Sequence, residues 1–128
     1  MKGIYVLLIA IDSDISIDAG ALGMLKLEKG SYAYVGSAQN NLEKRVARHL
    51  RKEKKKFWHI DYLLDNANVR VLKVLYRNAR RPEECKIARK MERRGLPIQG
   101  FGSSDCRCRS HLFKIEKYEL LREYMMKQ

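Results

Sequence analysis

Arg45 and His49 lie four residues apart, a spacing that places both side chains on one face of a helix. A guanidinium stays charged at physiological pH and can bind two phosphate oxygens, so Arg45 is suited to hold a phosphate. His49 could contact the same phosphate or relay a proton. Tyr5 ends the tripeptide GIY and Tyr34 begins the tripeptide YVG, both in strand-like sequence. The spacing of Arg45 and His49 therefore predicts one helix face that could bind a phosphate, whereas tyrosines in strands are by themselves more often core aromatics.

A second group of residues could bind a metal. Cys106, Cys108 and His111 follow a Cys-x-Cys-x-x-His pattern, and with Cys85 they could supply four ligands to a tetrahedral zinc ion. The spacing differs from the common Cys-x-x-Cys, so small buried thiols in a tight loop are the alternative. Three cysteines without a regular framework argue against a secreted disulfide scaffold.

The tyrosines are expected on strands. Residues 3–11 are rich in β-branched and aromatic side chains, which predicts a strand buried on both faces. Residues 15–18 alternate with period two, and glycines punctuate the short meander that follows. Residues 31–37 predict another strand with Tyr34 on one face.

Arg45 and His49 are expected on a helix. Asn40 is a suitable N-cap with Glu43 three residues later, and the helix runs to about residue 51. The stripe of core residues expected on it is Leu42, Val46 and Leu50.

The rest of the chain alternates further elements. Residues 57–65 predict a second helix that buries Trp58, Tyr62 and Leu63, and residues 69–76 predict a strand. A third helix is bracketed by Pro82 and Gly95. Residues 98–110 read as a loop, 111–115 as a last strand, and the remainder from Glu116 as a helix. Its apolar residues would pack in the core or in a homodimer: Tyr118, Leu121 and Met125. This order predicts one α/β (α+β) domain over residues 1–128, with helices covering a small central sheet.

The net charge points to a polyanionic partner. The chain holds 27 Lys and Arg against 15 Asp and Glu, a formal charge of +12. The excess lies in residues 31–60 and 77–94, whereas residues 1–30 are slightly acidic. Nucleic acid explains this charge most simply, because basic proteins release counterions from phosphates. A membrane surface and a general adaptation to the host are the alternatives.

Membrane insertion is not expected. The longest apolar run, residues 4–11, is far shorter than the roughly 18 residues of a spanning helix. Asp12 and Asp14 end that run too early for a signal peptide, and no small-residue cleavage site follows. We therefore expect a cytoplasmic protein without a membrane partner.

The chain resembles the GIY-YIG nuclease superfamily. The two tripeptides that give the superfamily its name are matched by Gly3-Ile4-Tyr5 and, with Val in place of Ile, by Tyr34-Val35-Gly36. The superfamily's Asn-Leu pair and the Arg-x-x-x-His helix that follows it are matched by Asn41-Leu42 and by Arg45 and His49. More closely, the chain is similar to a small-domain branch found alone or fused to endonuclease III-type glycosylases. The segments that carry this likeness are 32–38 (YAYVGSA), 58–64 (WHIDYLL), Glu84-Cys85 and 100–113 (GFGSSDCRCRSHLF).

The resemblance implies a largely antiparallel sheet and a metal-dependent endonuclease of DNA, with a role in DNA repair as a further expectation. Tyr5 would be the general base, Tyr34 would orient water, and Arg45 would bind the phosphate, with His49 beside it. Glu84 would be the ligand of Mg²⁺ or Mn²⁺, since one carboxylate is enough for an ion that keeps several waters. The residues expected to follow the DNA backbone are Lys44, Arg48, Arg51 and Lys52.

The chain departs from the superfamily between the two tripeptides. There are 28 residues between Tyr5 and Tyr34, far more than is usual, which implies an inserted hairpin around residues 12–30. A non-catalytic nucleic-acid-binding module with the same fold is the alternative function. RNA also stays open as the polyanion.

Overall fold

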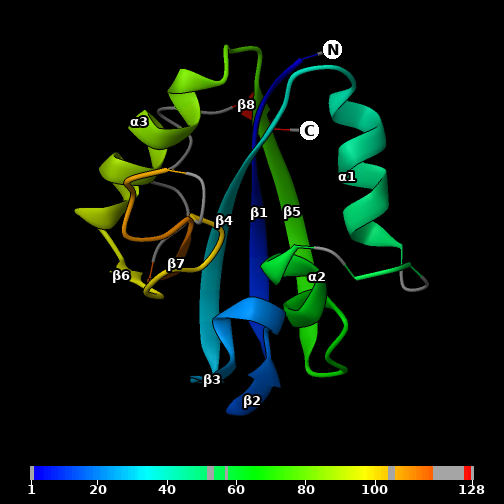
Figure 1. The fold of residues 1–128 in the computed structure, drawn as a ribbon, viewed down its shortest axis with the longest axis vertical. Coiled ribbons are helices and arrows are strands. Elements are labelled where there is room, and N and C mark those ends of the chain that lie inside the picture. Colours follow the sequence, from blue (N-terminus) through cyan, green and yellow to red (C-terminus); the bar gives the residue numbers. More distant parts are fainter. Residues whose placement is uncertain (1, 52–53, 57, 104–105, 117–125, 128) are drawn as a thin grey trace.

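The central element of the fold is one antiparallel sheet (Figure 1). The structure is a computed structural model, and it describes residues 2–51, 54–56, 58–103, 106–116 and 126–127. Among these residues the strand order is β6-β7-β4-β1-β5-β8, and every neighbouring pair is antiparallel. The strands are β1 (Gly3–Ile11), β4 (Gly30–Ala38), β5 (Val69–Arg77), β6 (Leu96–Pro97), β7 (Leu112–Ile115) and β8 (Met126–Lys127). The predicted fold class, a largely antiparallel sheet flanked by helices, is confirmed.

Helices cover both faces of the sheet. They are α1 (Leu42–Leu50), α2 (His59–Leu64) and α3 (Pro82–Glu92). The odd-numbered side chains of β1, from Tyr5 to Ile11, pack with α1 and α2, while Ile4, Val6 and Leu8 pack with α3. This alternation follows from the period-two geometry of a strand, and it confirms that β1 is buried on both faces.

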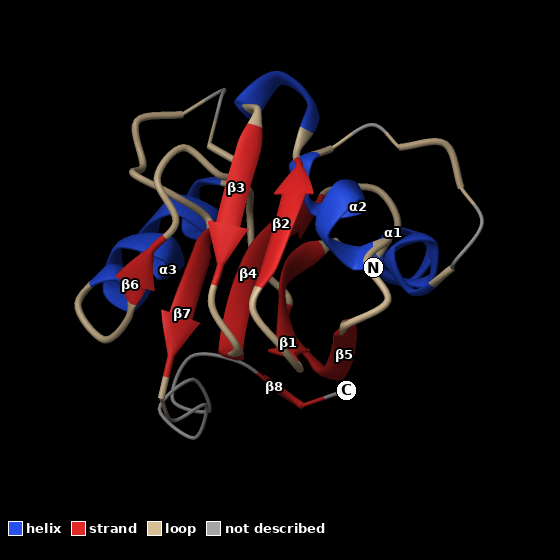
Figure 2. Cartoon of the chain, turned by 90° about the horizontal axis from the view of Figure 1, so that it is seen from below, coloured by secondary structure: helices blue, strands red, loops and turns tan. Residues whose placement is uncertain are grey.

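The inserted hairpin is present. It consists of β2 (Ile15–Asp18) and β3 (Met24–Leu27), with the short 3-10 helix η1 (Gly20–Leu22) between them. Figure 2 shows the hairpin at one end of the main sheet. Its apolar side chains Ile15, Ile17 and Leu27 are buried in the core that also holds α1 and α2. The insertion therefore extends the α1 side of the fold.

Helix α1 begins one residue later than expected. Its N-cap is Asn41, whose side chain accepts a hydrogen bond from the Lys44 N–H, so the prediction of Asn40 was wrong. Leu50 was also wrong as a core residue, because it is 51% exposed while His49 is buried. On a helix the seventh residue after Leu42 lies about 20° from it and the eighth about 80° away, so His49 faces the core.

Helix α2 differs from its prediction in what it buries. Trp58 precedes the helix and Tyr62 lies on it, and both are half-buried rather than in the core. The buried residues of α2 are Ile60, Asp61, Leu63 and Leu64. The expected burial of Leu63 is thus confirmed.

The C-terminal helix is not confirmed. Most of the segment, including Tyr118, Leu121 and Met125, lies outside the described residues. Met126–Lys127 pairs with Leu75 and Tyr76 of β5 as a strand, so the prediction of a helix to the chain end was wrong. The β5 edge offers backbone partners there, and pairing with them satisfies hydrogen bonds that a helix would form internally.

No helix in the described part of the chain is both long and apolar enough to cross a membrane.

Candidate active site

A cavity of about 900 Å³ lies on the α1 side of the sheet, and four of the residues predicted for catalysis and metal binding line it. Tyr5 comes from β1, Tyr34 from β4, Arg45 from α1 and Glu84 from α3. These residues are separated by up to 79 positions in the sequence. The fold therefore brings together side chains that the sequence pattern only places on separate elements.

Glu84 reaches this cavity although α3 covers the opposite face of the sheet. Strand β7 pairs with β4 only from Ser31 to Tyr34, and the His111 carbonyl accepts the Val35 N–H just beyond. Gly36–Ala38 thus extends past the end of β7. The first turn of α3 places Glu84 beside this part of β4, which β7 does not cover. The Glu84 side chain therefore reaches the cavity on the other side of the sheet.

The tyrosines form an aromatic group with His49. The Tyr5 hydroxyl lies 2.6 Å from His49 Nε2, and the Tyr34 and His49 rings make an edge contact at 6.2 Å between centroids. Burial raises the pKa of both phenols, and the Arg45 guanidinium only partly offsets this effect. Both groups are therefore neutral phenols in the resting site.

Gly36 explains why the second tripeptide ends in glycine. A Cβ atom at this position would collide with the ring and hydroxyl of Tyr5. The absence of a side chain lets the Tyr5 ring lie against the β4 backbone and point its hydroxyl at His49. Gly3 plays a similar part on β1, since a Cβ there would collide with the Arg77 carbonyl of β5.

His49 lies behind the tyrosines and does not line the cavity. Its side chain is 2% exposed, and burial lowers its pKa to about 4, helped by Lys54 and two arginines and opposed by Asp61. It is thus neutral at pH 7. Its Nδ1 atom is buried and has no hydrogen-bond partner among the described residues. This placement suits a proton relay through Tyr5 better than direct contact with a phosphate.

Arg45 is held at the cavity wall by two contacts. Its Nη1 donates a hydrogen bond to the Ser37 carbonyl at 3.0 Å, and its guanidinium lies 4.5 Å from the Trp58 ring centroid. Arg48 lies 4.3 Å from the same ring. Trp58 is therefore stacked with both arginines, which fixes the position of the charge on Arg45.

Arg48 itself is tied to a buried carboxylate. It donates two hydrogen bonds to Asp61, at 2.8 and 2.9 Å, and a third to the Lys55 carbonyl. Asp61 is fully buried and also accepts the Trp58 N–H at 2.9 Å. Arg48 lines the cavity, but its guanidinium is already largely used in holding α1 to α2.

Positive side chains dominate the charge of the cavity. Lys44, Arg45 and Arg48 line it from the first basic block and Arg81 from the second, whereas Glu84 is the one acidic residue among the described residues that line it. The two basic blocks of the sequence therefore contribute to one cavity.

The remaining predicted backbone contacts lie elsewhere. Arg51 caps the C-terminal end of α1, is exposed, and does not line the cavity; Lys52 is outside the described residues. Lys54 donates to the carbonyls of Arg48, His49 and Arg51. Lys54 thus satisfies backbone carbonyls at the C-terminal end of α1.

The four predicted zinc ligands also come together. Cys85, Cys106, Cys108 and His111 bring their ligand atoms within 4.8 Å of one another, and the three cysteines are not disulfide-bonded. His111 Nδ1 lies 2.9 Å from Glu84 Oε2, an ion-pair distance without hydrogen-bond alignment. The cluster therefore adjoins the cavity through Glu84.

Three residues of the site were not identified from the sequence. The sequence places Trp58 in the core and Arg81 in a basic block, and it gives Asp61 no role. His59 also lines the cavity, and its Nδ1 accepts the Gly102 N–H. The sequence does carry a signal for the contact between Trp58 and Asp61. A tryptophan directly precedes a helix with Asp at its third position, and such an Asp can accept the Trp backbone N–H.

Comparison with known proteins gives one match. Residues 4–128 match the model of a family described as "Domain of unknown function DUF123". No curated protein matches the chain. No solved structure matches it either.

Proposed function

The chain belongs to the DUF123 family, and we propose that it is a DNA-binding, metal-dependent endonuclease that hydrolyses phosphodiester bonds. The observation that carries the proposal is the convergence of Tyr5, Tyr34, Arg45 and Glu84 on one basic cavity. The resemblance of the tripeptides and of the Arg-x-x-x-His helix to GIY-YIG nucleases supports the same reading. A role in DNA repair and a cytoplasmic location form part of the proposal.

Arg45 would bind the scissile phosphate. Hydrolysis adds negative charge to the phosphate oxygens in the transition state, and a fixed cation stabilises that charge without reorganisation. The Ser37 and Trp58 contacts hold Arg45 in place before DNA arrives. Lys44, at the same wall, would bind a neighbouring phosphate and add affinity without sequence preference.

Tyr5 and His49 would remove the proton from the attacking water. Burial disfavours a resting phenolate, so Tyr5 would accept the water proton as its own proton passes to His49 Nε2, 2.6 Å away. The water oxygen then bonds to phosphorus while the ester P–O bond breaks, and the leaving oxygen takes a proton from solvent. Tyr34, at the cavity wall, would orient the water.

Glu84 fits the binding of one divalent cation. Its carboxylate lines the cavity, and Mg²⁺ or Mn²⁺ is typically held by one or two carboxylates together with waters and a substrate phosphate. The contact with His111 uses Oε2, so the cation would be bound through Oε1. When bound, such an ion neutralises charge on the phosphate and lowers the pKa of a water.

A non-catalytic nucleic-acid-binding module is the second candidate. The observation that favours it is the upward pKa shift of both tyrosines, which leaves almost no phenolate at neutral pH to act as a base. This module would bind DNA or RNA through the same basic cavity and would need no metal.

Purified protein incubated with Mg²⁺ or Mn²⁺ and with duplex, single-stranded, branched and damaged DNA tests the proposal. We expect cleavage of at least one substrate by the wild type, loss of cleavage in Glu84→Ala, and no loss in Glu83→Ala. Glu83 is the matched control because it is the adjacent carboxylate on α3 and does not line the cavity. Salt-dependent binding without cleavage of any substrate would favour the non-catalytic module.

A further inference from the structure

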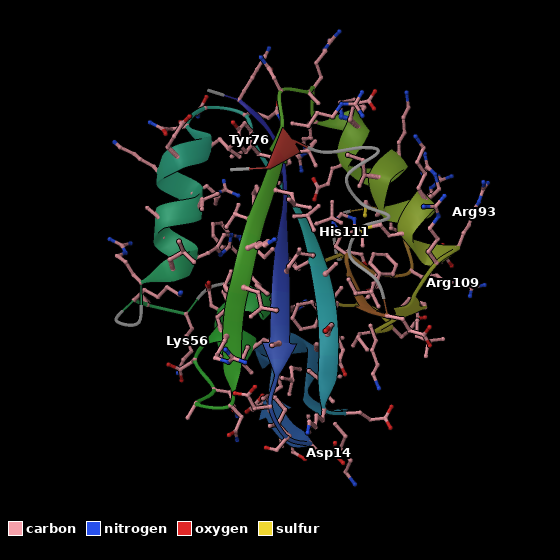
Figure 3. All side chains as sticks on the ribbon, turned by 180° about the vertical axis from the view of Figure 1, so that it is seen from behind. Asp14, Lys56, Tyr76, Arg93, Arg109 and His111 are labelled. Carbon is pink, nitrogen blue, oxygen red and sulfur yellow. The ribbon has the colours of Figure 1, made fainter. Side chains whose placement is uncertain are left out.

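All three cysteines of the chain lie in one cluster with His111, at the edge of the proposed active site. Cys85 is on the first turn of α3, and the other three residues are on the loop that leads into β7. Cys85 is thus separated from its neighbours in the cluster by more than 20 residues of sequence. Figure 3 shows His111 between the sheet and α3.

The spacing of the four ligand atoms fits a tetrahedral zinc site. Zn–S bonds of about 2.3 Å and Zn–N bonds of about 2.0 Å at tetrahedral angles separate the ligand atoms by about 3.5 to 3.8 Å. The distance from Cys106 Sγ to His111 Nε2 is 3.4 Å, and all four ligand atoms lie within 4.8 Å of one another. Small side-chain rotations would therefore close the shell around one ion.

The orientation of His111 is the one that a metal ligand adopts. Its side chain is 3% exposed, with Nε2 toward Cys106 and Nδ1 toward Glu84 Oε2 at 2.9 Å. Histidines bound to zinc usually donate the N–H of the other ring nitrogen to a carboxylate, which fixes the ring and its tautomer. His111 places Nε2 beside a thiol and Nδ1 within reach of the Glu84 carboxylate, and a small rotation of the ring would align the Nδ1 N–H with Oε2.

A disulfide accounts for the cluster less well. Pairing any two of the thiols leaves the third thiol and His111 without a role, whereas one zinc ion uses all four residues. The thiols are half-buried and face one another. Thiolates and an imidazole are the ligands of structural zinc sites, and these sites are normally closed by four protein groups.

We propose that Cys85, Cys106, Cys108 and His111 bind one structural zinc ion, and that Glu84 holds His111 in the orientation for binding it. The ion joins the loop before β7 to the first turn of α3. Glu84 is then a positioning residue for the zinc site as well as a cavity residue. This inference concerns the metal content of the protein without DNA, so it stands or falls separately from the proposed nuclease activity.

Metal analysis of protein purified without added metal is the first test. We expect about one zinc per chain in the wild type and in Ser103→Ala, and a clear loss of zinc in Cys106→Ser. Ser103 is the matched control because it lies in the same loop and is not a ligand. Replacement of zinc by Co²⁺ should give the absorption bands of a tetrahedral thiolate complex. Wild-type protein that contains almost no zinc and gives no such Co²⁺ spectrum would overturn the proposal.

Zinc affinity measured by competition with a chelator tests the part of Glu84, even if Cys106→Ser fails to fold. We expect Glu84→Gln to bind zinc about 10- to 100-fold more weakly than the wild type, and Glu83→Gln to bind it equally well. Equal affinities for all three proteins would contradict the contribution of Glu84. Unchanged zinc affinity in Glu84→Gln together with loss of DNA cleavage would support the nuclease role of Glu84 and contradict its part in the zinc site.

Discussion

Asp61→Asn should destabilise the protein far more than a matched change at its surface. Asp61 is fully buried and accepts hydrogen bonds from Arg48 Nη1, Arg48 Nη2 and the Trp58 N–H. An Asn side chain keeps one acceptor oxygen, but its NH₂ group would face a donor. The substitution also removes the negative charge that compensates Arg48.

The expected loss of unfolding free energy is about 3 kcal/mol. Removing one partner of a buried ion pair costs about 3 to 5 kcal/mol, and the lower end applies because the Arg48 side chain is 22% exposed. For a chain of this length the loss corresponds to a fall in melting temperature of about 10 °C. The Arg70–Asp12 pair has the same chemistry, but its side chains are 61% and 48% exposed. Asp12→Asn should therefore cost less than about 1 kcal/mol.

Urea unfolding followed by circular dichroism measures both variants against the wild type. Because Arg48 and Trp58 together position Arg45, Asp61→Asn should also weaken DNA binding under conditions where the variant is folded, and Asp12→Asn should not. Equal free-energy losses in the two variants would refute the inference that Asp61 holds Arg48 and Trp58 in place at the cavity wall.

Three further outcomes are expected. Gly36→Ala should cost about 1 to 3 kcal/mol and abolish cleavage, because the new Cβ collides with Tyr5; normal cleavage by a stably folded variant would argue against this contact. Acidification from pH 7 to pH 4 should lower the free energy of unfolding by up to about 3 kcal/mol through His49. The pKa of His49 is about 4 in the folded protein and higher in the unfolded chain. The unfolded chain therefore takes up the proton first as the pH falls, which favours unfolding. In urea titrations this fall should be smaller in His49→Gln, and an identical fall in both proteins would contradict it. Lys44→Ala should lower the slope of log affinity against log salt by about 0.9, whereas Lys26→Ala, on the exposed face of the hairpin, should leave it unchanged; equal slopes would place the DNA elsewhere.

The elements of the fold could be predicted largely because their signals are local. Residues 3–11 carry the continuous apolar run of a central strand, and Pro82 and Gly95 bracket α3. The errors in α1 arose where neighbours one residue apart compete. Asn40 and Asn41 are the same residue type, and only the bond from Lys44 N–H shows which of them caps α1.

The candidate site could be predicted only in part, because its contacts are long-range. Tyr5, Tyr34 and Arg45 were found through their motifs. No sequence spacing shows that Asp61 accepts two hydrogen bonds from Arg48, or that Trp58 contacts two arginines rather than being buried in the core. These contacts depend on how α1 and α2 pack, which tertiary structure alone determines.

Single-turnover cleavage of saturating DNA by the wild type and by Tyr5→Phe, in the presence of Mg²⁺ or Mn²⁺, would show whether Tyr5 takes part in phosphodiester hydrolysis. Removing the hydroxyl deletes the group 2.6 Å from His49 and leaves the basic wall of the cavity unchanged. We predict equal DNA affinities and a cleavage rate about 10²- to 10⁴-fold lower in Tyr5→Phe. Cleavage by Tyr5→Phe at the wild-type rate, or no cleavage by the wild type with any metal and substrate, would contradict the account.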